Sequence, residues 1–362
     1  MKAAGRDDRS RAARLAAYRG VSTALALCSD LELRDLVDAA EPVGAGIGGS
    51  TALLDVGGTR VFVKRVPLTG LERRPEHVRS TANLFGLPDF AHFGVGALGS
   101  PGFGAWRELA GHTMTTNWVL AGDHEGFPLT YHWRVLPHPG QPLPEELADV
   151  ERAVGYWGGG PAVRRRIEAV RDCTASIVLF LEHLPQNLHD WLGGQVEAGG
   201  ETADRACAMV VRELRDGTAF MNDRGLLHFD LHFQNILTDG ERLFFADYGL
   251  AISSGFDLSA PEAGFFAGHQ SYDRCYSLTH LVIWLATALY GYRGQERGAF
   301  LRACAGGERP KGIPPLAAAI LTEYAPLAVV MTDFYREFQV GSRQVPYPAE
   351  ALSRIAAPGR SW

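Results

Sequence analysis

The residues best suited to chemistry lie in one stretch of the second half of the chain, residues 225–249. It reads Gly-Leu-Leu-His-Phe-Asp-Leu-His-Phe-Gln-Asn-Ile-Leu, and it places Asp230 five residues before Asn235. An apolar segment, Leu-Phe-Phe-Ala, leads into Asp247, which begins an Asp-Tyr-Gly tripeptide twelve residues after Asn235. Phosphoryl transfer uses such groups, because an aspartate can orient a hydroxyl while an asparagine and a second aspartate hold magnesium. The structural alternative is that Asp230 caps a helix and that Asn235 and Asp247 lie in turns, but their joint spacing favours chemistry.

This pattern resembles the catalytic loop and the metal-binding loop of the protein kinase-like superfamily. The resemblance implies ATP as phosphoryl donor and Mg²⁺ as cofactor, with Asp230 as catalytic base and Asn235 and Asp247 as metal ligands. It also implies an α+β fold with two lobes, a small one built on an antiparallel sheet and a larger, mainly helical one.

A glycine-rich segment before the first strands supports the same resemblance. Two strand-like segments follow it, 50–56 and 59–66, and the second contains Val-Phe-Val-Lys64. A dinucleotide-binding fold would instead continue into a helix, so the context is that of a kinase nucleotide loop. By resemblance the loop glycines bind the nucleotide, and Lys64 contacts its α- and β-phosphates; these glycines are Gly44, Gly46 and Gly49. A second match to the same pattern, Gly94 to Gly99, runs into Ser-Pro and is interpreted as part of an insertion.

Lys64 should pair with an acid on the following helix. Glu108 is our candidate, although it follows Lys64 by 44 residues, and Glu76 is the rival. The apolar strand 177–184 resembles the one that enters the kinase hinge, where backbone groups bind adenine. By that resemblance Glu182, Leu184 and, after the catalytic loop, Leu237 contact the nucleotide. Phe62 stands where kinases usually carry a small alanine over the adenine ring.

The acceptor is left open between three hypotheses. The first hypothesis is a protein or peptide Ser/Thr kinase, because Ala260-Pro-Glu262 resembles the end of a kinase activation segment. Asp273 resembles the residue that opens a buried kinase helix, and we predict that it is the N-cap of that helix. A small-molecule phosphotransferase, such as an antibiotic-modifying enzyme, is the second hypothesis, since Phe229 and His232 depart from the protein kinase pattern toward the aminoglycoside and choline phosphotransferase branch. A non-catalytic nucleotide-binding scaffold is the third.

The remaining pattern supplies the expected organisation. We predict a helical extension at 1–42, a smaller lobe at 43–184 and a larger lobe at 185–362. A capping box, Ser29 to Glu32, should open a helix that ends before Pro42. Residues 67–104 are expected to form a helix and then an irregular insertion. Further predicted elements are a helix at 105–120, strands at 130–136 and 177–184, and helices at 204–224 and 276–290.

Composition limits the other functions. The chain has 362 residues, 46% hydrophobic, with a net charge of −6, so we expect no nucleic-acid partner and no membrane partner. Its five cysteines are scattered without a Cys-x-x-Cys pair, and the polar start lacks the apolar core of a signal peptide, which together indicate the cytoplasm. The basic run Arg164 to Arg166 is explained as a solvated helix face. No sequence feature specifies an oligomeric state.

Overall fold

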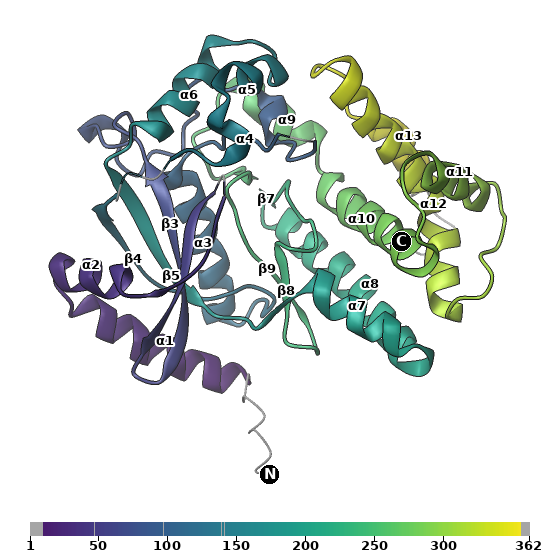
Figure 1. The fold of residues 1–362 in the computed structure, drawn as a ribbon, viewed down its shortest axis with the longest axis horizontal. Coiled ribbons are helices and arrows are strands. Elements are labelled where there is room, and N and C mark those ends of the chain that lie inside the picture. The colour runs from purple at the N-terminus through teal and green to yellow at the C-terminus, as the bar shows by residue number, and fades with distance from the viewer. Residues whose placement is uncertain (1–9, 47, 97, 139, 141, 356–362) are drawn as a thin grey trace.

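The fold is mixed α+β, as the computed structural model of residues 10–46, 48–96, 98–138, 140 and 142–355 shows (Figure 1). Its largest sheet has five antiparallel strands in the order β1-β2-β3-β5-β4. The bounds of these strands are Glu41–Gly46 for β1, Gly49–Val56 for β2, Thr59–Leu68 for β3, Thr130–Pro137 for β4 and Ala175–Glu182 for β5. The predicted mixed α+β class and the antiparallel sheet are thus confirmed.

Helices cover the sheet from both sides, which explains why all eight residues of β5 are buried. Side chains alternate along a strand with a period of two. Val178 and Phe180 pack in the same cluster as residues of α1 (Arg11–Ala26) and α2 (Asp30–Asp38). Ile177 and Leu179 pack instead against Trp106 of α3 (Ala105–Ala121). The predicted capping box is present at the start of α2, whereas α1 was not predicted.

Two long insertions leave the same end of this sheet, because Leu68 and Pro137 both pair with Ala175. The first insertion, residues 69–104, contains the 3₁₀ helices Pro75–His77 and Asp89–His92 but not the α-helix we predicted there. The prolines and glycines of this segment, together with its buried hydrogen bonds, prevent a regular helix from forming there. The second insertion, residues 138–174, contains three helices, α4 (Glu145–Ala148), α5 (Val150–Tyr156) and α6 (Pro161–Arg171). The sequence analysis anticipated a helix there only at Arg164 to Arg166, within α6.

The rest of the chain is mainly helical, with short strands that carry the loops of the site (Figure 1). Strands β6 (Gln186–Asn187), β8 (Ile236–Thr238) and β9 (Leu243–Phe245) form one sheet, and β7 (Leu226–Leu227) pairs with β10 (Ile252–Ser253). The helices are α7 (Leu188–Ala198), α8 (Gly200–Asp223), α9 (Ala260–Gly268), α10 (Tyr272–Tyr290), α11 (Gly294–Ala305), α12 (Pro315–Arg336) and α13 (Ala349–Ile355). The helices predicted at 204–224 and 276–290 therefore exist, with bounds a few residues earlier at the start.

Helix α12 and the turn that follows it, Pro315–Gly341, are apolar enough over 27 residues to cross a membrane by length and composition alone. A core helix meets the same criterion. Here α12 packs against α10 and α11, and Leu321, Ala325 and Ala328 on it are fully buried within the protein.

Candidate functional site

Strand β3 and helix α3 bring Lys64 and Glu108 together. Lys64 shares the α3 face of β3 with Phe62 and Val66, because alternate residues of a strand point the same way. Its Nζ lies 2.7 Å from Oε1 of Glu108 and 2.9 Å from Oδ2 of Asp247. Glu76 is exposed in the first 3₁₀ helix. Of the two acids considered from the sequence, Glu108 is therefore the one that pairs with Lys64.

Lys64 stabilises the charges of the two carboxylates beside it, although burial raises the pKa of Glu108 to about 7. Lys64 is 5% exposed, and burial opposes its charge, but the carboxylates of Asp247 and Glu108 more than offset burial and raise the pKa of Lys64. Burial likewise opposes ionisation of Asp247, yet Lys64 holds the pKa of Asp247 below its ordinary value. An ammonium has three donors and two carboxylate oxygens lie within reach of Nζ, so one donor remains for an anionic ligand.

Asp230 and Asn235 lie in the short loop between β7 and β8. Nδ2 of Asn235 donates to Oδ2 and to the backbone oxygen of Asp230, both at 3.0 Å. Burial, assisted by the nearby charge of Asp247, raises the pKa of Asp230 to about 7. The carboxyl side chain still has 20% of its surface exposed, so a ligand can reach it.

Two residues of the site hold left-handed backbone conformations, Phe229 at φ 66° and Asp247 at φ 70°. Such conformations cost free energy for residues other than glycine and persist only where the surroundings fix them. Asp273 fixes the first, since its carboxylate accepts the backbone N–H of His228 at 2.5 Å and of Phe229 at 2.8 Å. The ring of His228 joins both loops through Nε2 and the backbone oxygen of Ala246, 3.0 Å apart.

Asp273 does not cap α10, contrary to our prediction. The N-cap position is Ser271, which makes no side-chain capping bond, and Asp273 lies in the first turn with its carboxylate turned toward the loop. The motif Ala260-Pro-Glu262 begins α9, where Ser259 and Glu262 form a capping box. Glu262 also makes a buried ion pair with Arg107 of α3 at 2.6 Å, which ties the segment after Asp247 to the helix that carries Glu108.

A cavity of about 410 Å³ lies between the sheet and the loop of Asn235. Apolar and backbone groups of residues 181–187 line one side, with Phe62 and Leu237, whereas Lys64, Asn235 and Asp247 form the polar end. The predicted nucleotide contacts Glu182, Leu184 and Leu237 all line it.

The predicted glycines lie elsewhere. None of Gly44, Gly46 and Gly49 lines the cavity that contains Lys64. Gly44 and Gly46 are exposed residues of β1, and Gly49 has φ 113° where an added Cβ would lie 1.9 Å from the backbone oxygen of Arg65. Gly48 approaches the site instead, because a Cβ there would lie 3.1 Å from Nζ of Lys64.

Glu182 has a structural partner that the sequence did not reveal. Its carboxylate receives Nε and Nη2 of Arg14, at 2.8 and 2.7 Å, and the backbone N–H of Leu129 at 3.0 Å. Arg14 is 4% exposed and also donates to the backbone oxygens of Glu125 and Phe127. Helix α1 thus anchors the end of β5, from which the cavity wall 181–187 continues.

His112 is a second residue that the sequence analysis missed. It is 1% exposed, neither ring nitrogen has a hydrogen-bond partner, and it lines the same cavity. Its position one helical turn after Glu108 was the available signal. Next to it, Gly111 allows α3 to approach the Asp-Tyr-Gly segment, because a Cβ there would lie 2.7 Å from Cβ of Tyr248.

The donors at the polar end fit a hard cation. Asn235 and Asp247 offer oxygen ligands, the type that Mg²⁺ prefers, and Mg²⁺ commonly completes its shell with phosphate and water. Within the described ranges, no group of three or more His, Cys, Asp or Glu side chains is arranged to hold a metal ion, so a cation here would need those further ligands. No protein-family model matches this sequence.

Proposed function

We propose that this protein is an ATP-dependent phosphotransferase with a two-lobed, kinase-like architecture. The five-stranded sheet with α3 would be the smaller lobe, and the helices from α7 onward the larger. One observation carries the proposal: the buried residues Lys64 and Glu108 form a charge cluster with the half-buried Asp247 at the polar end of an apolar cavity. The bonded pair Asp230 and Asn235 belongs to the adjoining loop.

The cavity suits a nucleotide in both parts. Its wall with Phe62, Leu181 and Leu184 is the kind of apolar surface that binds a flat base, and Lys64 has a donor left for phosphate oxygens. Mg²⁺, when bound, would neutralise phosphate charge, and Asn235 and Asp247 would hold it.

Asp230 would accept the proton of the acceptor hydroxyl. The hydroxyl oxygen would form a bond to the γ-phosphorus of ATP while the bond between that phosphorus and the β-phosphate oxygen breaks. A pKa of about 7 places Asp230 near the value at which a general base is effective in neutral solution. The acceptor is a hydroxyl of a protein or peptide, which the sequence favours, or of a small molecule. The retained cluster disfavours a non-catalytic scaffold.

Calorimetry of Mg·ATP binding tests the nucleotide part of this proposal. Lys64→Ala should weaken binding about tenfold or more, since it removes the cation at the phosphates. Arg60→Ala is the matched control, because Arg60 lies on the same strand but pairs with exposed Glu41. Equal affinities in both variants, or binding unchanged when EDTA removes Mg²⁺, would contradict the proposal.

A further inference from the structure

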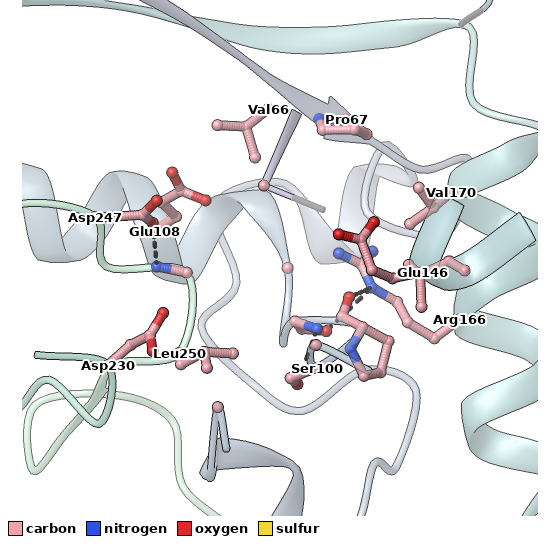
Figure 2. A pocket seen from close by; sticks show the side chains of 18 of the residues that line it. Val66, Pro67, Ser100, Glu108, Glu146, Arg166, Val170, Asp230, Asp247 and Leu250 are labelled. Carbon is pink, nitrogen blue, oxygen red and sulfur yellow. Dashed lines mark hydrogen bonds between the residues drawn. The ribbon is translucent and has the colours of Figure 1, made fainter. Parts of the chain in front are cut away.

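A second cavity, of about 280 Å³, opens on the carboxyl group of Asp230 (Figure 2). Among the residues of the described chain that line the two cavities, Asp247 alone belongs to both. The first cavity has Lys64 and Asn235 but not Asp230, and the second has Asp230 but not Asn235. The two spaces therefore meet at Asp247 and approach the reacting groups from different sides.

The two insertions build the far wall of this cavity. Arg166 of α6 is 5% exposed, so it is not part of a solvated helix face as the sequence suggested. Its Nε donates to the backbone oxygens of Pro101 and Gly102, and its Nη1 lies 3.2 Å from Oε2 of Glu72. Oε1 of Glu72 accepts the backbone N–H of Ala105 at 2.7 Å. Arg166 thus joins the second insertion to the first and to the start of α3.

The aromatic side chains of α5 and the loop after it add two more links between the insertions. The hydroxyl of Tyr156 donates to the backbone oxygen of Val95, and Nε1 of Trp157 donates to that of Gly99, at 3.2 and 3.1 Å. The glycine-rich segment that follows His92 is therefore held in place as a wall.

The first insertion also covers the chain beside Asp230. Nδ1 of His92 lies 2.7 Å from the backbone oxygen of Leu250, and Oγ1 of Thr81 accepts the backbone N–H of Asp257 at 2.9 Å. Gly94 lies so close that an added Cβ would be 2.7 Å from Oδ1 of Asp230. On this side an acceptor reaches Asp230 through the cavity, because the first insertion covers the chain beside Asp230.

The charges that face the cavity are mainly negative. Figure 2 shows Asp230 and Asp247 on one side and Glu146 of α4 with Arg166 on the other. Arg166 and His232 are the basic residues among the described lining. Glu72 and two backbone oxygens already occupy the guanidinium of Arg166, and Nε2 of His232 lies 3.8 Å from Oδ2 of Asp230. Glu146 is exposed and has no such partner among the ion pairs of the described residues. A negatively charged acceptor would meet repulsion here.

We propose that this cavity is the acceptor site, and that the acceptor is a compact, neutral or cationic compound with a hydroxyl group directed at Asp230. The inference rests on the proposed phosphotransferase function. A volume of about 280 Å³ is near the lower end of the range of roughly 300–1,000 Å³ that is typical of small-molecule sites. Val66, Pro67 and Val170 supply apolar contact, and Glu146 favours a positive or neutral group opposite the reacting hydroxyl.

The experiment offers γ-labelled ATP and Mg²⁺ to the full chain, with four classes of acceptor: neutral polyols such as inositol, amino alcohols such as ethanolamine and aminocyclitols, sugar phosphates, and a random pool of Ser/Thr peptides. We expect label in the polyols or amino alcohols. Val170→Trp should fill the cavity from α6 and raise the acceptor KM about tenfold or more, with Mg·ADP affinity within about twofold of the parent.

Glu168→Trp is the matched control, because Glu168 lies on the same helix and outside the cavity, and it should leave the acceptor KM unchanged. A second pair separates charge from volume: Glu146→Gln should weaken amino alcohol acceptors, whereas Glu145→Gln next to it should not.

Three results would overturn the inference: label in the peptides, sugar phosphates as the best acceptors, or an acceptor KM that Val170→Trp does not change. Mg·ADP binding together with ATP hydrolysis, but no label in any small compound, would also overturn it and leave the phosphotransferase proposal in place. Absence of Mg·ADP binding would instead contradict the proposed function itself.

Discussion

Replacement of Asp273 by alanine should destabilise the protein and disable the loop of Asp230 together. The carboxylate of Asp273 is 2% exposed and accepts two backbone N–H groups, those of His228 and Phe229. Alanine leaves both donors buried without an acceptor. It also removes the contact that holds Phe229 at φ 66°.

The size of the effect follows from these contacts. A buried donor that loses its partner costs about 1–3 kcal/mol, so two cost roughly 2–6 kcal/mol. Part of this is offset, because burial raises the pKa of Asp273 to about 6 despite its bonds to the two N–H groups, and the variant no longer buries that carboxylate. We therefore expect a loss of about 2–4 kcal/mol, a large share of the roughly 5–15 kcal/mol by which proteins are stable.

Urea denaturation at pH 8, where the parent Asp273 is ionised, measures this loss. Asp273→Asn keeps one carboxamide oxygen as acceptor and should lose about half as much. Asp223→Ala, at the exposed end of α8, is the control and should change stability by less than about 0.5 kcal/mol. If Asp273→Ala lost less than about 1 kcal/mol and kept its phosphoryl transfer rate, the two bonds would not hold this loop and the reasoning would be wrong.

Three other predictions follow from particular contacts. Gly111→Ala should lower the melting temperature and the transfer rate, because its Cβ would lie 2.7 Å from Tyr248, whereas Gly20→Ala on the open surface of α1 should be neutral or stabilising; equal effects would refute the close approach. Acid should destabilise the fold, because burial lowers the pKa of several histidines below the ordinary 6.5, most strongly to about 3 in His92, His112 and His280 and to about 4 in His228 and His269. The contribution of these neutral histidines to stability is fully present above pH 6.5 and is lost as pH falls from there toward 4, by about 1.4 kcal/mol per histidine per pH unit. Asp230 and Asp273, whose pKa values are raised, oppose this loss. A melting temperature unchanged between pH 7 and pH 5 would contradict the prediction. Activity should not depend on phosphorylation of the segment that follows Asp247. Phe229 cannot pair with a phosphate and stacks on Tyr272, and Ser253 in that segment is buried. A phosphatase-treated parent that lost most of its activity and regained it on incubation with ATP would refute this.

Local patterns predicted much of the fold. The β-branched, extended character of 59–66 predicted β3, the apolar run from Ile177 predicted β5, helical periodicity predicted α3, α8 and α10, and the capping box located the start of α2. The period of two along a strand places Lys64 on the α3 face of β3, where the structure has it beside Glu108. These features depend on neighbours a few residues apart, so a sequence expresses them directly.

Contacts between distant segments were not predictable in this way. Arg14 and Glu182 are 168 residues apart, and Arg166 and Glu72 are 94 apart. A charged residue in a helix is usually solvated, so nothing in the local pattern of Arg166 indicated burial. The prediction of a helix after β3 was wrong for a related reason. Buried hydrogen bonds such as those of Glu72 and His92 outweigh the local helix propensity of this segment.

The role of Asp230 as catalytic base is tested by transfer of label from γ-labelled ATP, measured with and without Mg²⁺ in the parent and in Asp230→Asn. Asp230→Asn keeps the shape of the side chain but cannot accept the hydroxyl proton, so transfer should fall about 10²- to 10⁴-fold while Mg·ATP affinity stays within a few-fold of the parent. Asp223→Asn, outside the site, should transfer label at the parental rate. Near-normal transfer by Asp230→Asn, or equal transfer in the presence of EDTA, would contradict the account.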